Sequence, residues 1–189
     1  MFIQTETTPN PATLKFLPGR PVLPGGTLDL RGPDEATHSP LAARLFAVDG
    51  VSGVFFGSDF VTVTKSEGEW QHLKPAILGA LMEHFLREEP VVLDDGAGGK
   101  AAAAAEEFYN PDDEPVVGTI KELLETRVRP AVAADGGDIT FRGFRDGIVY
   151  LNMQGSCSGC PSSTATLKRG IENLLRHFVP EVEEVRPVE

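Results

Sequence analysis

Alternating apolar and polar positions predict the strands of a first domain over residues 1–93. Residues 2–5 and 13–17 are typical of strands, and the Thr-Pro-Asn-Pro turn at 8–11 separates them, because each proline disfavours helix in the residue before it. Residues 51–56 and 60–64 are two β-rich runs joined by Gly-Ser-Asp. That arrangement predicts a β-hairpin.

Apolar residues at helical spacing predict two helices in the same domain. Ser39 is a typical N-cap, Pro40 fits the first turn, and Gly50 is expected to end the helix. A second helix has its apolar face at Trp70, Leu73, Ile77, Leu81 and Phe85. Its proline, Pro75, is compatible with a helix only near the first turn or at a kink. We therefore expect a small α/β sandwich with its helices on one side.

Residues 115–189 predict a second small domain. The acids and proline at 112–115 favour a helix start, an apolar stripe follows, and Pro130 is expected to end that helix. Strands are predicted at 139–141 and 147–153, then a helix ending near Phe178 and a short closing strand at 182–185. The expected fold class is α+β: an N-terminal hairpin-containing sheet with two helices, and a C-terminal helix-strand-strand-helix-strand domain.

Residues 94–114 combine glycine, alanine and acidic residues, with little apolar face to bury, and predict a flexible linker. The net charge of −11 lies mostly in the front of the chain, since residues 1–114 hold 8 Lys+Arg against 18 Asp+Glu. This acidity argues against nucleic acid as a partner. No run approaches the roughly 18 to 20 apolar residues of a membrane span, and the N-terminus lacks a targeting pattern. We therefore expect a cytoplasmic protein without a membrane partner.

Cys157 and Cys160, the only two cysteines, lie in the Gly-rich stretch 155–162 between a predicted strand and a predicted helix. A helix N-terminus leaves N–H groups unpaired and carries partial positive charge, so both thiols should ionise more easily than free cysteine. Lys168 and Arg169 add positive charge further along the helix. The setting suits a thiolate or an anionic cluster.

Three interpretations of this pair of cysteines are open. Small buried apolar residues fit poorly with the glycines around them. A dithiol/disulfide oxidoreductase has its motif at a similar strand-to-helix junction, but no aromatic residue stands beside Cys157 and the domain is short for that fold. A metal centre usually needs four protein ligands. No histidine lies near the cysteines in sequence; the histidines of the chain are His38, His72, His84 and His177.

The simplest source of the missing ligands is a second copy of the same loop. A two-fold dimer would supply four thiolates around a shared centre and would release it on opening. This favours transient carriage over electron transfer. We expect a homodimer when the cluster is bound and a monomer without it.

Residues 119–130 (TIKELLETRVRP), 135–138 (DGGD) and 155–163 (GSCSGCPSS) strongly resemble the Nfu family, relatives of the C-terminal domain of NifU. Residues 8–11 and 39–65 resemble the N-terminal domain of its two-domain members. The resemblance implies an Nfu N-terminal-like domain at 1–93, the linker at 94–114 and a NifU C-terminal-like domain at 115–189.

The resemblance also implies a non-enzymatic iron–sulfur cluster scaffold or carrier. It would receive a [4Fe-4S] cluster from upstream assembly proteins and transfer it to apo-iron–sulfur proteins, with Cys157 and Cys160 of each subunit as ligands; a [2Fe-2S] cluster stays open. The N-terminal domain would either help to recognise recipients or serve solubility and assembly. Asp135 and Asp138 are interpreted as turn residues that cap backbone groups rather than as acid/base or metal-binding groups.

Overall fold

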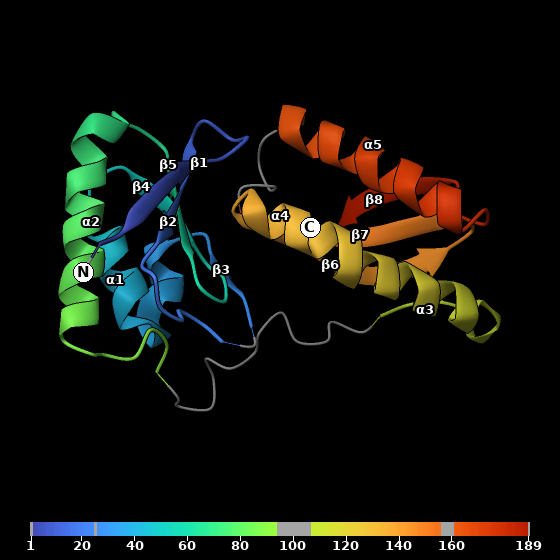
Figure 1. Cartoon of the computed structure of the whole chain (residues 1–189), viewed down its shortest axis with the longest axis horizontal. Helices are drawn as coiled ribbons and strands as arrows, with labels where there is room; N and C mark the ends of the chain where they lie inside the picture. Colours follow the sequence, from blue (N-terminus) through green and yellow to red (C-terminus); the bar gives the residue numbers. More distant parts are fainter. Residues whose placement is uncertain (1, 25, 94–106, 156–160, 189) are drawn as a thin grey trace. The chain divides into compact units, whose positions relative to one another are not determined.

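The structure is a computed structural model that describes residues 2–24, 26–93, 107–155 and 161–188, with the side chains of 161–163 excepted. The chain divides into two compact units, Met1–Ala103 and Ala104–Glu189, each with its own hydrophobic core. The units mix helices and strands (Figure 1), and this confirms the α+β class.

The N-terminal unit contains a five-stranded antiparallel sheet in the order β1-β2-β5-β4-β3. Its strands are β1 (Gln4–Thr7), β2 (Thr13–Leu17), β3 (Leu28–Leu30), β4 (Val51–Phe56) and β5 (Val61–Lys65). The predicted hairpin is confirmed, since β4 and β5 pair with Val54 opposite Val63. Phe16, Phe56 and Val61 are fully buried in the core of this unit.

Two α-helices complete this unit, α1 (Pro40–Phe46) and α2 (Trp70–Leu86). Ser39 caps α1 as predicted: its hydroxyl accepts from the Ala42 N–H at 3.1 Å and donates to the Val91 carbonyl at 2.5 Å. Pro75 lies inside α2 rather than in its first turn. The apolar face of α2 enters the core through Ile77 and Leu81, which are both fully buried.

Two elements between β2 and α1 were not predicted. They are β3 and the 3₁₀-helix η1 (Pro33–His38). Strand β3 is only three residues long, too short to show an alternating pattern, and it forms by pairing with β4, with Leu28 opposite Phe56. Its position therefore depends on a partner far along the chain.

The C-terminal unit contains a three-stranded sheet in the order β6-β7-β8. Strands β6 (Gly137–Arg145) and β7 (Ile148–Gly155) are antiparallel, whereas β8 (Glu184–Val188) runs parallel to β7. Its helical segments are η2 (Pro111–Asp113), α3 (Glu114–Leu123), η3 (Leu124–Val128), α4 (Arg129–Ala134) and α5 (Pro161–Phe178). The predicted order of elements is confirmed, with a longer first helical region.

The prediction that Pro130 ends the first helix is wrong. The helical region continues to Ala134 because η3 is a π-helical turn, after which α4 begins with Pro130 in its first turn. Proline lacks the N–H that an uninterrupted α-helix would use. The change to π-type bonding just before Arg129 lets the chain continue as helix through this position.

The end of the predicted linker differs from expectation. Residues 94–106 lie outside the described residues, but Phe108 forms a parallel bridge with Gly143 at the edge of β6. The Phe108 N–H donates to the Arg142 carbonyl at 3.1 Å, and its carbonyl accepts from the Phe144 N–H at 2.8 Å. Its ring lies over Gly143 and packs against Tyr150 with centroids 5.0 Å apart. Backbone pairing and aromatic packing therefore join residues 107–109 to this sheet, which composition alone did not indicate.

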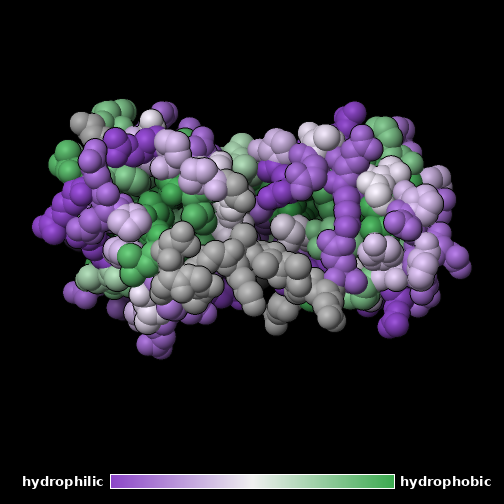
Figure 2. Space-filling model, turned by 90° about the horizontal axis from the view of Figure 1, so that it is seen from below, coloured by the Kyte–Doolittle hydropathy of each residue, from purple (hydrophilic) through white to green (hydrophobic). Residues whose placement is uncertain are grey.

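Hydrophilic side chains cover much of the face that Figure 2 shows, with smaller apolar patches between them. The large apolar side chains that are exposed among the described residues are Phe2, Met82, Leu86, Leu93, Phe108, Tyr109 and Phe178. No helix among the described residues has the length and apolar character of a membrane span.

Candidate functional site

The described residues frame the cysteine loop on both sides. Strand β7 ends at Gly155 and helix α5 begins at Pro161 (Figure 1). Cys157 and Cys160 lie between them, outside the described residues, so their role as ligands stays a prediction. The described residues show the predicted setting, with a strand before the loop and a long helix after it.

The last rungs of the β6–β7 ladder lead directly to this loop. Gly137 pairs with Gly155, and Asp138 pairs with Gln154. Gly136 and Gly155 adopt left-handed backbone angles, with φ of 81° and 70°. Residues with a side chain adopt such angles only at a cost, so glycine is favoured at both places. The Asp-Gly-Gly-Asp stretch thus turns the chain into β6 at the same end of the sheet from which the cysteine loop departs.

Asp138 has a larger role than the turn residue that the sequence suggested. Its carboxylate accepts from Arg129 through both oxygens, from Nε at 2.9 Å and from a terminal nitrogen at 3.1 Å. Oδ1 also accepts from the Ile139 N–H at 2.8 Å, so the expected bond to a backbone group is present as well. The hydrogen bonds to Asp138 raise the pKa of Arg129 above its usual range. Only 6% of the Asp138 side chain is exposed, so this is a buried carboxylate with a dedicated cationic partner.

Sequence reasoning missed Arg129. It lies nine positions before Asp138 and beside a proline expected to break the helix, so no periodicity joins the two residues. Asp135 has a different environment, because it closes α4, and its N–H donates to the Val132 carbonyl at 3.1 Å. The burial of Asp138, which reveals the need for a cationic partner, becomes evident only in the structure.

Lys168 is paired with an acid and shares that acid with a second cation. Its ammonium lies 3.3 Å from the Glu184 carboxylate on β8, and Arg186 bonds the same carboxylate at 3.2 Å. Hydrogen bonds from Arg186 and Lys168 hold the pKa of Glu184 below its usual value. This cluster ties α5 to β8, which keeps the helix that follows the loop against the sheet.

No group of three or more His, Cys, Asp or Glu side chains suited to a metal lies among the described residues. His84 is the only fully buried histidine among them, in the core of the N-terminal unit. Burial, together with Arg44, lowers its pKa, while Glu89 acts in the opposite direction. Its nearest recorded acid is Glu89, with Nδ1 3.9 Å from a carboxylate oxygen. This is a packing histidine rather than a metal ligand.

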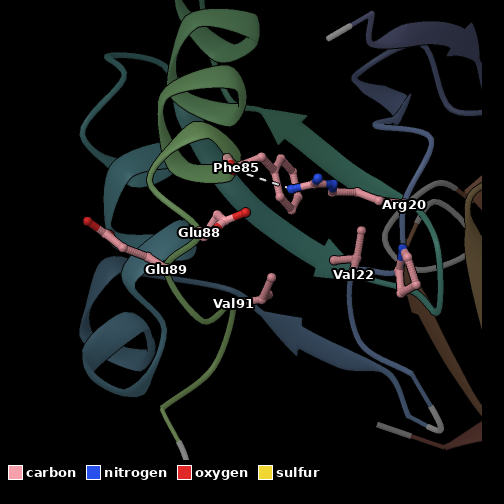
Figure 3. Close-up of a pocket in the computed structure, with 7 residues that line it drawn as sticks. Arg20, Val22, Phe85, Glu88, Glu89 and Val91 are labelled. Carbon is pink, nitrogen blue, oxygen red and sulfur yellow. Dashed lines mark hydrogen bonds between the residues drawn. The ribbon is translucent and has the colours of Figure 1, made fainter.

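An open pocket of about 510 Å³ lies in the N-terminal unit, on the side where α2 ends (Figure 3). Arg20 extends over the Phe85 ring and donates to the Phe85 carbonyl at 3.2 Å. Val22 and Val91 form its apolar wall, and Glu88 and Glu89 lie on the rim; these and Pro21 complete the lining. Since Arg20 is already engaged with Phe85, the pocket presents no preformed binding group of evident specificity.

Two family profiles match the chain in succession. The first, described as the N-terminal domain of the scaffold protein Nfu/NifU, matches residues 3–88, and the second, described as a NifU-like domain, matches residues 120–186. The human protein named "NFU1 iron-sulfur cluster scaffold homolog, mitochondrial" is 50% identical over 190 residues, which cover 100% of this chain and 72% of the human protein. This chain belongs to the NFU1 iron–sulfur cluster scaffold family.

Other relatives agree with this membership. The Arabidopsis thaliana protein named "NifU-like protein 4, mitochondrial" is 54% identical over 188 residues, 98% of this chain and 65% of that protein. The chain therefore spans between 65% and 72% of the length of these two NFU1-type relatives.

Among solved structures, that of a NifU-like protein from Saccharomyces cerevisiae is 31% identical, with a TM-score of 0.46 over 50% of this chain and 87% of the yeast chain. A crystal structure of a Staphylococcus aureus protein is 22% identical, with a TM-score of 0.38 over 43% of this chain and 99% of that one.

The expectation of a cytoplasmic protein is wrong. The relatives that match over nearly the whole chain are named as mitochondrial, in human, Arabidopsis thaliana and Drosophila erecta. The expectation depended on the lack of a targeting pattern at the N-terminus. Targeting segments are removed from mature proteins and form no part of the fold, so their absence does not determine location.

Proposed function

We propose that this member of the NFU1 family carries a [4Fe-4S] cluster as cargo and delivers it to apo-iron–sulfur proteins. Cys157 and Cys160 would hold the cluster, together with the same two residues of a second copy. The chain would bind and release its cargo without catalysing a reaction. Upstream cluster assembly proteins would load it, and the relatives' names point to a mitochondrial setting.

One observation carries this proposal: a scaffold-family chain has only two cysteines, spaced Cys-x-x-Cys between β7 and α5. Iron–sulfur clusters usually take four protein ligands, so one chain supplies half of the set. The described residues offer no cluster of further ligands. A second copy related by a two-fold axis is the simplest source of two more thiolates.

The position of the loop also favours thiolate. The N-terminus of an 18-residue helix, α5, follows the second cysteine directly, and the partial positive charge of that terminus stabilises an anion. Because thiolate is the form that binds metal, loading should be possible near neutral pH. Four thiolates in a dimer are also given up readily, since separating the two copies leaves each with two ligands.

The N-terminal unit has no cysteine, so its contribution concerns partners rather than ligation. Recipient recognition and control of solubility or assembly are both compatible with its five-stranded sheet. A comparison of transfer rates to several recipients, with and without substitutions on its exposed side chains, separates the two. Recipient-dependent changes indicate recognition.

Transfer of the cluster tests the proposed function. The chain is loaded anaerobically with iron and sulfide and mixed with a cluster-free dehydratase, whose recovered activity is followed over time. We expect recovery with the unsubstituted chain and none with Cys157→Ser or Cys160→Ser. A protein that takes up no iron but reduces disulfides catalytically would instead be a dithiol oxidoreductase, and the proposal would be wrong.

A further inference from the structure

The end of the β6–β7 ladder nearest the cysteine loop is held by an ion pair that the cluster-carrier function does not by itself require. Asp138 lies one rung from Gly155, the residue where β7 ends. The Arg129 fork reaches it from α4 and bonds both of its oxygens. The pair therefore connects α4 to β6 at Asp138, which is opposite Gln154, the residue before Gly155.

The two side chains of this ion pair are buried to different extents. The Asp138 side chain is 6% exposed and that of Arg129 is 34% exposed. A buried carboxylate that loses its partner is strongly destabilised, whereas a partly exposed guanidinium can turn to water. Asp138 therefore depends on Arg129 more than Arg129 depends on Asp138.

The backbone before Arg129 is adapted to this contact. The π-helical turn η3 directly precedes Arg129, and the helix then continues past Pro130. Such turns are uncommon and occur frequently at functional sites. Glu125, in the same turn, bonds Arg129 from the solvent side, where its own side chain is 63% exposed. The turn, the fork and the left-handed Gly136 thus converge on one end of the sheet.

The group formed by Arg129, Asp138 and Glu125 is less suited to an electrostatic role toward an anionic cluster. Asp138 and Glu125 together offset the single charge of Arg129, so the three side chains carry no net positive charge. What the contacts provide is geometric: three hydrogen bonds fix the Asp138 carboxylate to α4 and to the Ile139 N–H.

We propose that Arg129 and Asp138 are positioning residues for cluster binding, which hold the β6–β7 strand ends in the arrangement from which the cysteine loop departs. This inference rests on the proposed function for its cluster readout, but its geometric part concerns the apo-protein. Loss of the fork should loosen the strand ends before it loosens the rest of the sheet. A loosened end should hold the cluster for a shorter time.

Three variants of the full chain test this. Asp138→Asn removes the buried charge, Arg129→Lys keeps a cation but cannot form the fork, and Glu125→Gln is the matched control that changes only the exposed end of the group. In the apo-protein, amide hydrogen exchange at residues 137–139 and 153–155 reports the strand ends, and exchange at Val149 and Leu151, on the central strand β7, reports the remainder of the sheet. We expect about 10- to 100-fold faster exchange at the strand ends for the first two variants and little change for the control.

The second readout is the half-life of the reconstituted cluster in the presence of an iron chelator. It should follow the order unsubstituted ≈ Glu125→Gln, then Arg129→Lys, then Asp138→Asn. Equal half-lives in all four proteins would overturn the inference, as would exchange that rises equally throughout the sheet, because the pair would then only stabilise the fold. If the unsubstituted chain takes up no cluster, the proposed function fails, and the exchange measurement still decides whether the pair holds the strand ends.

Discussion

The two units of this chain differ in the hydrogen bonding of a buried polar side chain. In the N-terminal unit His84 is fully buried, and neither ring nitrogen has a hydrogen-bond partner among the described residues. In the C-terminal unit Asp138 is almost as deeply buried, but Arg129 bonds both of its oxygens. Burial lowers the pKa of His84, whereas Asp138 is bonded to a cationic partner.

The difference coincides with a difference in backbone. In the N-terminal unit, which also contains the 3₁₀-helix η1, both α1 and α2 are α-helical throughout, and α1 begins at an ordinary Ser39 cap. The first helical region of the C-terminal unit changes to a π-helical turn at Leu124–Val128, and left-handed glycines lie at both strand ends next to the cysteine loop. Among the described residues, the π-helical turn is therefore what distinguishes the C-terminal unit, and it directly precedes Arg129, the partner of Asp138.

The largest expected effect concerns cluster ligation, which is proposed for the C-terminal unit alone. Cys157→Ser should abolish cluster retention, because a bound centre would lose two of its four thiolates in the dimer. Ser158→Ala, in the same loop, is the matched control and should load normally. Iron and sulfide content after anaerobic reconstitution and desalting measures both. Retention of a full cluster by Cys157→Ser would place the ligands elsewhere and remove the proposed contrast.

The next largest effect concerns core packing, which can be weakened in each unit separately. Ile77→Ala in the N-terminal core and Ile139→Ala in the C-terminal core each truncate a fully buried side chain. Each should lower the free energy of unfolding of its own unit by about 2 to 5 kcal/mol, measured by urea denaturation. Only Ile139→Ala should also shorten the half-life of the cluster, because Ile139 is adjacent to Asp138 and pairs with Met153. A shorter half-life with Ile77→Ala as well would mean that the units are coupled.

A third prediction concerns pH. Burial lowers the pKa of His84, so the folded N-terminal unit keeps the ring neutral where the unfolded chain already protonates it. The stability of this unit should therefore be fully present above about pH 6.5, the ordinary histidine pKa, and fall as pH drops from there through the folded-state pKa. Thermal unfolding followed between neutral and mildly acidic pH measures it.

His84→Gln should remove most of this pH dependence, whereas His72→Gln, at an exposed position of the same helix, should keep it. The C-terminal unit has no buried histidine among its described residues, so its unfolding should change less over the same range. If both units lose stability in parallel, the isolated His84 is not the cause.

The smallest expected effect concerns the end of the linker. Phe108→Ala removes a ring that is 42% exposed and packs over Gly143 and Tyr150, so unfolding of the C-terminal unit should become easier by about 1 kcal/mol. Phe2→Ala, with a ring that is 85% exposed, is the control and should change little. Hydrogen exchange at the Phe144 amide, which donates to the Phe108 carbonyl, reports the contact directly. No change at that amide would mean that residues 107–109 contribute nothing to the sheet edge.

Patterns of local spacing predicted most of the fold. The hairpin β4–β5, the Ser39 cap and helix α5 all depend on residues that are near one another in sequence, and all were predicted. Strand β3 was missed because its three residues become a strand only by pairing with β4. The helix past Pro130 was missed because proline is a helix breaker by local rules, and a π-helical turn changes the bonding that those rules assume.

The candidate site was predictable in part for the same reason. The cysteines and their setting between a strand and a helix follow from short sequence patterns and from the family resemblance. The Arg129–Asp138 fork joins residues on different elements across the turn 135–138. Because Asp-Gly-Gly-Asp is already accounted for as a turn, the sequence gives no reason to expect a distant partner for Asp138. The cytoplasmic location was predicted wrongly, because the N-terminal pattern on which it depended does not decide location; the relatives' names point to mitochondria.

The mass of the reconstituted protein under native conditions tests the central claim most directly. After anaerobic loading with iron and sulfide, we expect a dimer that contains one [4Fe-4S] cluster, and a monomer once the cluster has been removed by a chelator. A complete cluster held by a single copy of the chain, or a dimer that forms without iron and never binds it, would contradict the account.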